Sequence, residues 1–446
     1  MSAMDQGYET QMSIEDGFTL SAVGDCISTR ALAPSTEREP DFASAVELIR
    51  TADVGFGNLE TGVFDIRGFE GFPRQMEDWA IQGPPEVAAD LKSLGFDLMS
   101  RANNHAVDWS IEGMRETSDW LDGAGIVHAG VGETLAQARA PRFLETPKGR
   151  VGLVSLHTTS RVDQAQALDQ FGQVPPRPGF NSLRLRLTVN VRPEILEELR
   201  EIERQLDPAQ QNAISKPGSK GFALLGTRFE PGEATAVKFE PYAEDMVEIL
   251  KAVRGGKQAC DFLVISAHVH EEGVDADTHP TFLTEVAHAL IDAGADAFIG
   301  HGVHRMWPVE IYEGKPIFYG LGNFIFIDII EPLTGALYDD ARDHVDRAVA
   351  TDAEVNRALG SEGFSDPRYY ESVVVQLRVS DGSISTTLRP IDLGYGTGLT
   401  RMGIPRLARG EKAQAILSRL AQMSGQLGTE FAIEGDSAEL RGSGVS

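Results

Sequence analysis

Short apolar runs alternate with amphipathic segments along most of this chain, and this alternation limits the folds that the chain can adopt. Apolar runs of about four to eight residues are typical of buried strands, and apolar residues at helical spacing are typical of helices that cover a sheet. The alternation favours an α/β domain with a mostly buried sheet. We predict strands over residues 18–25, 54–60, 96–105, 126–130, 151–157, 261–268 and 296–300, and helices over 41–52, 84–95, 110–125 and 281–295.

Other regions depart from this alternation. Residues 307–324 and 371–393 each have the pattern of a β-hairpin, with turns at "YEGK" and "SDGS", and they predict an antiparallel element beside the α/β region. Residues 158–240 are rich in glycine and proline around a charged helix predicted over 192–206. Because a long irregular segment inside a compact domain is usually functional or mobile, we interpret 158–240 as an insertion or lid.

The predicted organisation is one main domain over 17–400, with a flexible N-terminus over 1–16 and a C-terminal helix and polar tail over 401–446. The N-terminus lacks the basic and apolar regions of a secretion signal. No apolar run reaches the roughly 18 residues that a membrane span requires. We therefore expect a cytoplasmic protein, and a homo-oligomer is compatible with the sequence.

The charge balance restricts the partners of the chain. There are 40 Lys and Arg residues against 67 Asp and Glu residues, a net charge of −27. Such a surface repels phosphate backbones and anionic lipids, which excludes nucleic acid and membrane as general partners. An anionic substrate would need local positive charge, which metal ions can supply. The only two cysteines, Cys26 and Cys260, lie far apart in the sequence, which excludes a zinc cluster built from thiolates.

Polar side chains follow the predicted strands at the points where the strands end. Open α/β sheets build their sites at the carboxyl edge of the strands, so we expect these side chains to lie close together. The residues concerned are Asp25, Asn58, Glu60, Asn103, Asn104, His105, His268, His270, His301 and His304.

Carboxylate, amide and imidazole donors without cysteine suit divalent Mn, Fe or Zn. A single histidine is more often structural than a ligand, and His157 and His279 stay undecided on that ground. The joint pattern favours a metal site, in which Glu60 is placed to bridge two ions. Seven candidate ligands are too many for one four-coordinate ion and fit two divalent ions: Asp25, Glu60, Asn104, His105, His268, His301 and His304. His105 is alternatively an acid or base, assisted by Asp108.

Several motifs resemble those of the CapA family, which is named for poly-γ-glutamate capsule biosynthesis. They are "GDCISTR" (24–30), "NLET" (58–61), "ANNHAVDW" (102–109), "HAGVGETLAQARAP" (128–141), "GHGVH" (300–304) and "PVEIYEGKPIFYGLGNF" (308–324). The fold of this family is similar to that of calcineurin-like metallophosphoesterases. The resemblance therefore implies an α/β (α+β) four-layer sandwich, in which two central mixed β-sheets are flanked by helices.

The resemblance also implies roles for individual residues. It places Asp25, Glu60, Asn104, His105, His268, His301 and His304 at metal and catalytic positions. The chain has "HVHEEG" where the family usually has a "HWGxE"-like motif, which aligns Glu272 with the family's glutamate. We expect proton transfer by His105, Asp108, His270 and Glu272. "RPGFN" (177–181) is a weaker match, and we expect substrate contacts from Arg30, Asn58, Asn103, Asn181, Arg184 and Asn323.

The leading hypothesis is a dinuclear hydrolase that directs a metal-activated water at an amide or peptide bond of a small or peptidic anionic substrate. The link of the family to γ-glutamyl polymers favours the amide bond over a phosphoester, which is the first alternative. A metal-assisted epimerase or isomerase is the second alternative. The third is a non-catalytic protein that binds polymer during capsule assembly.

Overall fold

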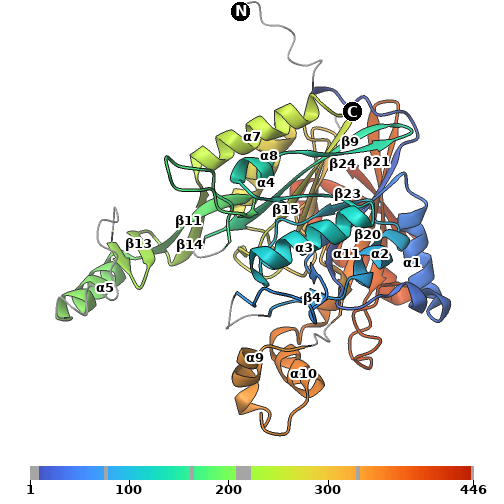
Figure 1. Cartoon of the computed structure of the whole chain (residues 1–446). Coiled ribbons are helices and arrows are strands. Elements are labelled where there is room, and N and C mark those ends of the chain that lie inside the picture. Colours follow the sequence, from blue (N-terminus) through green and yellow to red (C-terminus); the bar gives the residue numbers. More distant parts are fainter. Residues whose placement is uncertain (1–9, 75–78, 161–164, 207–221, 328–331, 443–446) are drawn as a thin grey trace, which may run out of the picture.

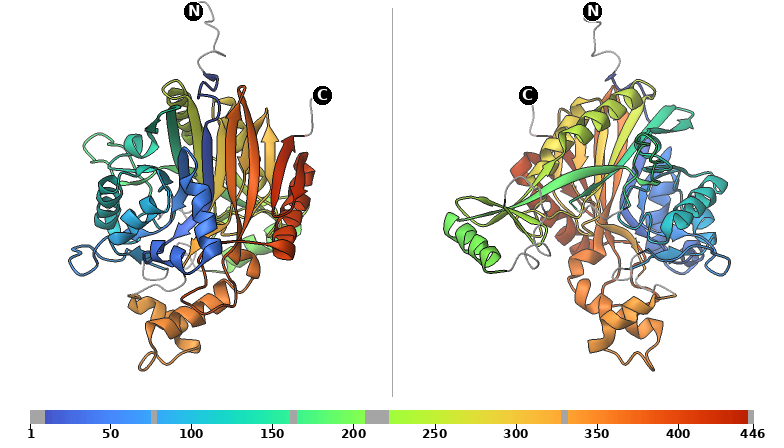
Figure 2. Two further views of the ribbon diagram at one scale, coloured as in Figure 1. Left: turned by 90° about the vertical axis from the view of Figure 1, so that its right-hand side faces the viewer. Right: turned by 60° about the vertical axis from the view of Figure 1, so that its left-hand side comes forward.

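The computed structural model describes residues 10–74, 79–160, 165–206, 222–327 and 332–442. Two ten-stranded mixed sheets lie face to face at its centre, and helices cover their outer faces (Figures 1 and 2). The predicted fold class, two central mixed sheets flanked by helices, is confirmed.

The first sheet has the order β23-β24-β21-β20-β1-β2-β5-β6, with β19 beside β1 and β22 beside β21. Its strands β1, β2, β5 and β6 are parallel to one another, and β20 is antiparallel to β1. The strands are β1 (Thr19–Ile27), β2 (Val54–Leu59), β5 (Leu98–Ser100), β6 (Val127–Ala129), β19 (Asn323–Phe326), β20 (Glu371–Ser380), β21 (Ser383–Asp392), β22 (Arg406–Leu407), β23 (Thr429–Glu434) and β24 (Ser437–Gly442).

The second sheet has the order β12-β13-β11-β9-β15-β16-β18-β17, with β14 beside β11 and β8 beside β9. Its central strands β11, β9, β15, β16 and β18 are parallel. The strands are β8 (Arg142–Thr146), β9 (Gly149–Thr159), β11 (Ser182–Val191), β12 (Phe222–Leu224), β13 (Thr227–Pro231), β14 (Ala236–Pro241), β15 (Phe262–His268), β16 (Ala297–His301), β17 (Val309–Tyr312) and β18 (Lys315–Phe318). Two small pairs join β3 (Gly62–Val63) to β4 (Gln82–Gly83), and β7 (Val131–Gly132) to β10 (Gly179–Phe180).

Three apolar layers hold the sandwich together. The facing surfaces of the sheets share one core, to which Leu20 and Phe56 contribute from the first sheet and Val264 and Ile299 from the second. A second core lies under α1 (Pro40–Arg50), α2 (Glu86–Ser93) and α3 (Ser110–Gly123). A third lies under α7 (Ala243–Lys257) and α8 (Thr281–Asp292). Burial of these apolar faces is the main force that fixes the two sheets relative to each other.

The remaining helices lie around these layers. They are η2 (Ala33–Glu37), α4 (Leu135–Arg139), α5 (Pro193–Gln205), α9 (Gly335–Asp340), η3 (Ala341–Asp343), α10 (Asp352–Gly363), η4 (Pro367–Tyr370), α11 (Gly410–Ser424) and η5 (Gly425–Leu427). α9, η3 and α10 form a cap with its own small core of Leu337, Ala341 and Val355, which projects at the bottom of Figure 1. Within the described residues, every helix is too short or too polar to span a lipid bilayer.

Strand β1 changes partner next to the site. Its first half pairs with β20 and its second half with β19, and the register shifts on either side of Asp25. Gly24 permits the change because a Cβ there would lie 1.9 Å from the carbonyl oxygen of Gly322. The close approach lets the Asp25 N–H donate to that same carbonyl at 3.0 Å.

Both predicted chain ends need correction. The predicted polar tail is instead the hairpin β23–β24, which extends the first sheet beside β21, and α11 packs into the core between the sheets. Residues 1–9 of the predicted flexible N-terminus lie outside the described residues, whereas residues 10–16 are not free. There the Ser13 N–H donates to the carbonyl of Asp261 at 3.1 Å, and Ile14 is buried. Polar residues alternate with apolar ones in these segments, because one face is exposed to solvent and the other is packed. In the sequence, so many polar residues are hard to distinguish from a loop.

The predicted insertion over 158–240 is partly a piece of the sandwich. The first part of β11 pairs with β9 inside the second sheet, and only its later part joins β13 and β14. That later part and α5 form an arm that projects from the body (Figures 1 and 2). The interpretation of the arm as a lid stays a prediction.

Candidate metal centre

The carboxyl ends of parallel strands from both sheets meet at one edge. Asp25 lies in β1 and is paired with Asn58 of β2. On the other sheet, His157, His268 and His301 occupy matching positions on the neighbouring strands β9, β15 and β16. The predicted gathering of polar strand ends is therefore present in the structure, and all five of these side chains are buried.

Asp25 is held on both of its carboxylate oxygens. Oδ1 accepts a hydrogen bond from Asn58 Nδ2 at 2.8 Å, and Oδ2 accepts one from the Gly302 N–H at 2.9 Å. Nδ1 of His301 and Nδ1 of His304 each lie 3.5 Å from this carboxylate. Burial would raise the pKa of Asp25, but the hydrogen bond from His304 and the charge of His301 hold it well below the usual range. Asp25 is therefore an anion fixed in place.

Glu60 follows β2 and has the opposite environment. It is fully buried, and neither of its carboxylate oxygens accepts a hydrogen bond from the described residues. Burial, and next the charge of Asp25, raise the pKa of Glu60 well above its ordinary value. A buried carboxylate without donors is costly unless it is protonated or coordinates a cation. This orphaned group fits a bound metal ion.

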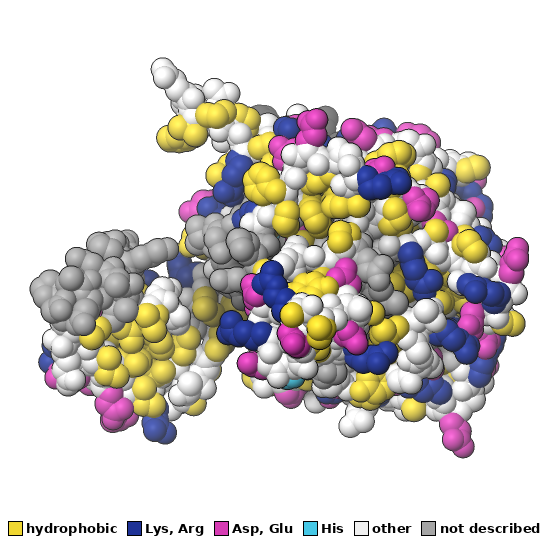
Figure 3. Space-filling view, turned by 60° about the horizontal axis from the view of Figure 1, so that its bottom comes forward, with side chains coloured by type: hydrophobic (Ala, Val, Ile, Leu, Met, Phe, Trp, Pro, Cys, Tyr) yellow, Lys and Arg dark blue, Asp and Glu magenta, His cyan; other side chains and the backbone are white. Residues whose placement is uncertain are grey.

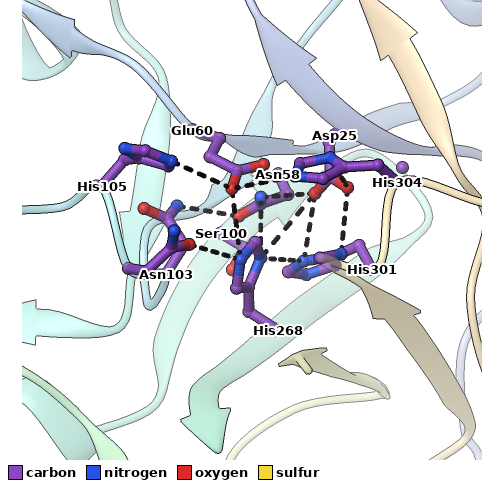
Figure 4. Close-up of polar contacts among 12 residues, drawn as sticks. Asp25, Asn58, Glu60, Ser100, Asn103, His105, His268, His301 and His304 are labelled. Carbon is purple, nitrogen blue, oxygen red and sulfur yellow. Dashed lines mark hydrogen bonds and ion pairs between the residues drawn. The ribbon is translucent and has the colours of Figure 1, made fainter. Parts of the chain in front are cut away.

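A ring of donors surrounds one nitrogen of His268. Its Nε2 lies 2.8 Å from Asn104 Oδ1 and 2.9 Å from His270 Nε2. It also lies 3.2 Å from Glu60 Oε1 (Figure 4). Donors bound about 2.1 Å from one ion lie roughly 3 Å apart when they subtend a right angle. The spacing of these four side chains is thus that of ligands sharing one ion. His270, predicted to transfer protons, is placed among the candidate ligands instead.

A tight turn after β16 places His304. Gly302 has a φ of +106° and His304 a φ of +60°, both in the left-handed region that disfavours side chains with a Cβ. Asn323 Oδ1 lies 2.9 Å from Nδ1 of His304, and the Asn323 amide donates to the carbonyl of Tyr369 at 3.0 Å. Asn323 therefore orients His304 and does not point into open space as a substrate contact would.

Replacing Gly302 by Ala is expected to disturb both the fold and the centre. The added Cβ would lie 2.8 Å from the backbone N and O of Val269, and the left-handed φ adds a cost of about 1–3 kcal/mol. Urea unfolding measures the loss of stability, and elemental analysis measures the metal content. Gly255→Ala is the control, because its Cβ would meet nothing within 4 Å in an exposed part of α7. Equal stability of the two variants would contradict the expectation.

Three overlapping sets of side chains have donor atoms close enough to hold a metal ion. Each set combines carboxylate oxygens with imidazole nitrogens, within 4.8 Å of one another. The sets are Asp25, His268 and His301; Glu60, His268 and His270; and Asp25, Glu60 and His304. Burial lowers the pKa of His301 to about 4 and that of His268 well below its ordinary value, so both rings are neutral and free to ligate at neutral pH.

His105 and Asp108 form a pair beside this cluster. Nδ1 of His105 lies 2.7 Å from Asp108 Oδ2, which also accepts the Ile81 N–H at 2.9 Å. Nε2 of His105 is directed toward Glu60, 3.9 Å from its Oε1 (Figure 4). The predicted contact of Asp108 with His105 is present, and it turns the other ring nitrogen toward the cluster.

A cavity of about 520 Å³ opens onto these residues. Asn104, His105, His270 and His304 line its floor. Seen from the side of the cap, histidine side chains hardly show at the surface (Figure 3). The candidate ligands Asn104, His270 and His304 therefore line a cavity of small-molecule size.

Comparison with known proteins identifies the family. The bacterial capsule synthesis protein family PGA_cap matches residues 19–328, which include every candidate ligand. The chain belongs to this family.

Relatives extend the match. An uncharacterized protein of Sinorhizobium fredii is 44% identical over 95% of this chain and 93% of its own length. The PGA biosynthesis protein CapA of Bacillus subtilis is 24% identical over 70% of this chain and 64% of its own. A probable polyglutamine synthesis accessory protein of Mycobacterium tuberculosis is 27% identical over 54% of this chain and 48% of its own length. An NAD nucleotidase structure from Haemophilus influenzae covers 91% of this chain and 56% of its own, with a TM-score of 0.32 and 9% identity, which is too weak a likeness to bear on function.

Several predicted substrate contacts lie elsewhere in this capsule synthesis family member. Arg30 donates to the carbonyl of Thr400 at 2.7 Å, and Arg184 is paired with Asp245 at 2.7 Å. Asn181 is buried and donates to the carbonyl of Ser155 at 2.8 Å. None of the three lines the cavity. A motif at a strand end predicts the position of the backbone. It does not predict which acceptor a long arginine side chain will bind.

Asn58 and Asn103 belong to the support of the centre. Asn58 holds Asp25, and the amide of Asn103 donates to Asn58 Oδ1 at 3.1 Å and to the carbonyl of Leu59 at 2.7 Å. Glu272 lines the cavity, but its Oε1 accepts from Arg305 at 2.6 Å and its side chain is 55% exposed. The predicted proton-transfer role of Glu272 is therefore not supported by its contacts.

Two cavity residues were not assigned a role from the sequence, which left His157 undecided and did not single out Glu271. His157 ends the run "VGLVSLH" as His268 ends "DFLVISAH", and this parallel was a usable signal. Glu271, next to the predicted Glu272, is the buried member of the pair and accepts from Thr158 Oγ1 at 2.5 Å. Nothing in the sequence distinguishes the two neighbouring glutamates, because which one is buried depends on the turn after β15.

Proposed function

We propose that this chain is a hydrolase that uses two divalent metal ions to cleave an amide bond in a small or peptidic substrate. The observation that carries the proposal is Glu60, a buried carboxylate whose oxygens accept no hydrogen bond from the described residues and which lies between two groups of donors. One group would comprise Asn104, His268 and His270, and the other Asp25, His301 and His304. Glu60 would serve both. Such oxygen and nitrogen donors suit Mn, Fe or Zn.

When bound, the ions would acidify a water molecule and polarise the scissile bond. The protein's own residues then have separate tasks. Asn58 and the Gly302 N–H hold Asp25, and Asn323 holds His304, so the donors are preorganised. Asp108 fixes the ring of His105, whose Nε2 faces the cluster and would deliver a proton to the leaving nitrogen.

Two observations support an amide over a phosphoester. Within the described part of the chain, the cavity lining contains neither Lys nor Arg, which phosphoester sites commonly provide beside their metals. The relative from Bacillus subtilis is named for PGA biosynthesis, and poly-γ-glutamate is joined by amide bonds. The relative from Mycobacterium tuberculosis, however, is named an accessory protein. A non-catalytic binding protein is therefore the second candidate.

The test combines elemental analysis with a substrate panel. Protein purified in metal-replete medium is expected to carry about two transition-metal ions per chain, as a dinuclear centre requires. The panel sets γ-glutamyl-p-nitroanilide and N-acyl amino acids against p-nitrophenyl phosphate, with chelated and reloaded protein as the control. Metal-dependent release of amine supports the proposal. Phosphate release alone would indicate a phosphoesterase instead of an amide hydrolase. Deuterium uptake from solvent without cleavage would indicate an epimerase. Metal without any turnover would favour the binding protein.

A further inference from the structure

The cavity above the candidate metal centre has one wall made of aromatic and aliphatic side chains. Trp79, Phe326 and Phe364 line it together with Ile27, Ile81 and Ile327. Ligand pockets are commonly lined by apolar side chains, and here these residues come from separate parts of the chain and pack in one cluster.

This wall begins at a candidate ligand. The ring of Phe364 lies 5.8 Å from that of His304, and 5.0 Å from that of Phe326, in edge-on contacts. Phe326 itself stacks over His304 at 6.0 Å. A group held at the metal centre would therefore touch this wall directly.

The fold fixes the wall in place. Phe364 follows α10, and the cap of α9, η3 and α10 closes over the cavity with Asn356 and Gly360 also lining it. Trp79 packs against both the core of the cap and the core under α1 and α2. The cap is thus joined to the body by the same side chain that forms the wall.

The charges near the cavity also favour a substrate that is not a polyanion. Among its described lining residues, the carboxylates Glu271 and Glu272 are the only charged groups besides the histidines. Glu271 is buried next to Thr158. Glu272 is paired with Arg305 at 2.6 Å, so Glu271 is the carboxylate that an extended polyanion would meet without a compensating cation among the described lining residues.

We propose that the substrate is a small molecule with an aromatic or branched aliphatic group next to its scissile bond, and not an anionic polymer. The inference rests on the proposed function, because the metal ions hold the polar end of the substrate while the wall receives the apolar group. The metal-bound end carries the substrate's anionic charge, if it has any.

Hydroxamic acids test this inference without turnover, since they chelate divalent metals. Titration calorimetry on the metal-loaded protein would compare acetohydroxamate, benzohydroxamate and the anionic succinomonohydroxamate. Burial of a phenyl group is expected to make benzohydroxamate bind about 10- to 100-fold more tightly than acetohydroxamate. Succinomonohydroxamate is expected to bind no better than acetohydroxamate.

Variants locate the preference. Phe364→Ala is expected to remove most of the advantage of benzohydroxamate over acetohydroxamate. Phe364→Leu keeps an apolar side chain there if the smaller one destabilises the cap, and is expected to reduce the advantage only in part. Phe171→Ala is the matched control, because Phe171 is 85% exposed and lies outside the cavity lining.

The outcomes separate the two proposals. If no hydroxamate binds and no metal is present, the proposed function fails. If all three hydroxamates bind equally, or if the anionic one binds best, the metal centre stands and the inference about the substrate is overturned. The inference about the substrate is also overturned if Phe171→Ala and Phe364→Ala reduce the preference for benzohydroxamate equally.

Discussion

Glu60→Gln is expected to lower the metal content from about two ions per chain to at most one and to reduce hydrolysis by at least about a thousandfold. Glutamine keeps the shape of the side chain but replaces a carboxylate oxygen by an amide nitrogen, which cannot serve both ions. Because Glu60 is fully buried and lacks hydrogen bonds from the described residues, its loss breaks few other contacts. Metal content by elemental analysis and turnover of the best substrate are the two measurements.

The pH dependence of metal binding provides an independent readout of the same residue. Burial and the charge of Asp25 raise the pKa of Glu60, so a proton must leave this carboxyl before it can ligate. Metal affinity of the native protein should therefore rise with pH through the raised pKa of Glu60 and fall as the pH drops below it. The variant should lose this part of the dependence, which calorimetry in buffers of different ionisation enthalpy detects as a smaller proton release.

Glu310→Gln is the matched control for this experiment. Glu310 is also buried, but it accepts a hydrogen bond from Tyr319 at 2.5 Å and lies near His288, away from the centre. This variant should lose some stability and keep its metal. Equal metal loss in both variants would mean that any buried charge change disrupts the protein, and would remove Glu60 from the centre.

The sequence predicted most of the sandwich because strand and helix patterns are local. The hairpin turn at "YEGK" is an example, since Glu313 and Gly314 take the left-handed φ values of 50° and 73° that a two-residue turn between twisted strands needs. The site followed from the strands by geometry. Parallel strands end at one edge, so a polar residue after each of several strands brings distant parts of the chain together.

The sequence could not predict what depends on packing between distant segments. The cap of α9, η3 and α10 carries a conventional helix pattern, but nothing local says that it closes over the cavity. The sequence predicted proton transfer for His270. In the structure, the turn after β15 brings its Nε2 to 2.9 Å from that of His268. Arg184 pairs with Asp245, sixty-one positions later in the chain, which no motif reveals.

His105→Gln is expected to reduce turnover by about a hundredfold to ten-thousandfold while the metal content stays that of the native protein. The reason is that Nε2 of His105 faces the cluster but lies 3.9 Å from Glu60, so its loss removes a proton donor and leaves the proposed ligands in place. Asp108→Asn should have a smaller effect in the same direction. Asparagine still accepts the Ile81 N–H, but it no longer stabilises a protonated His105.

The leaving group distinguishes proton donation from a merely structural role. A p-nitroaniline leaving group needs little protonation, whereas an alkylamine cannot leave without it. The loss of turnover in His105→Gln should therefore be much smaller for the p-nitroanilide than for the alkylamide of the same acid. His128→Gln is the control, because His128 is buried in the first sheet outside the cavity lining. If His105→Gln loses metal, or slows both substrates equally, His105 is a ligand or a support of the fold. The proton must then come from another group, and Glu271 is a buried candidate in the cavity wall.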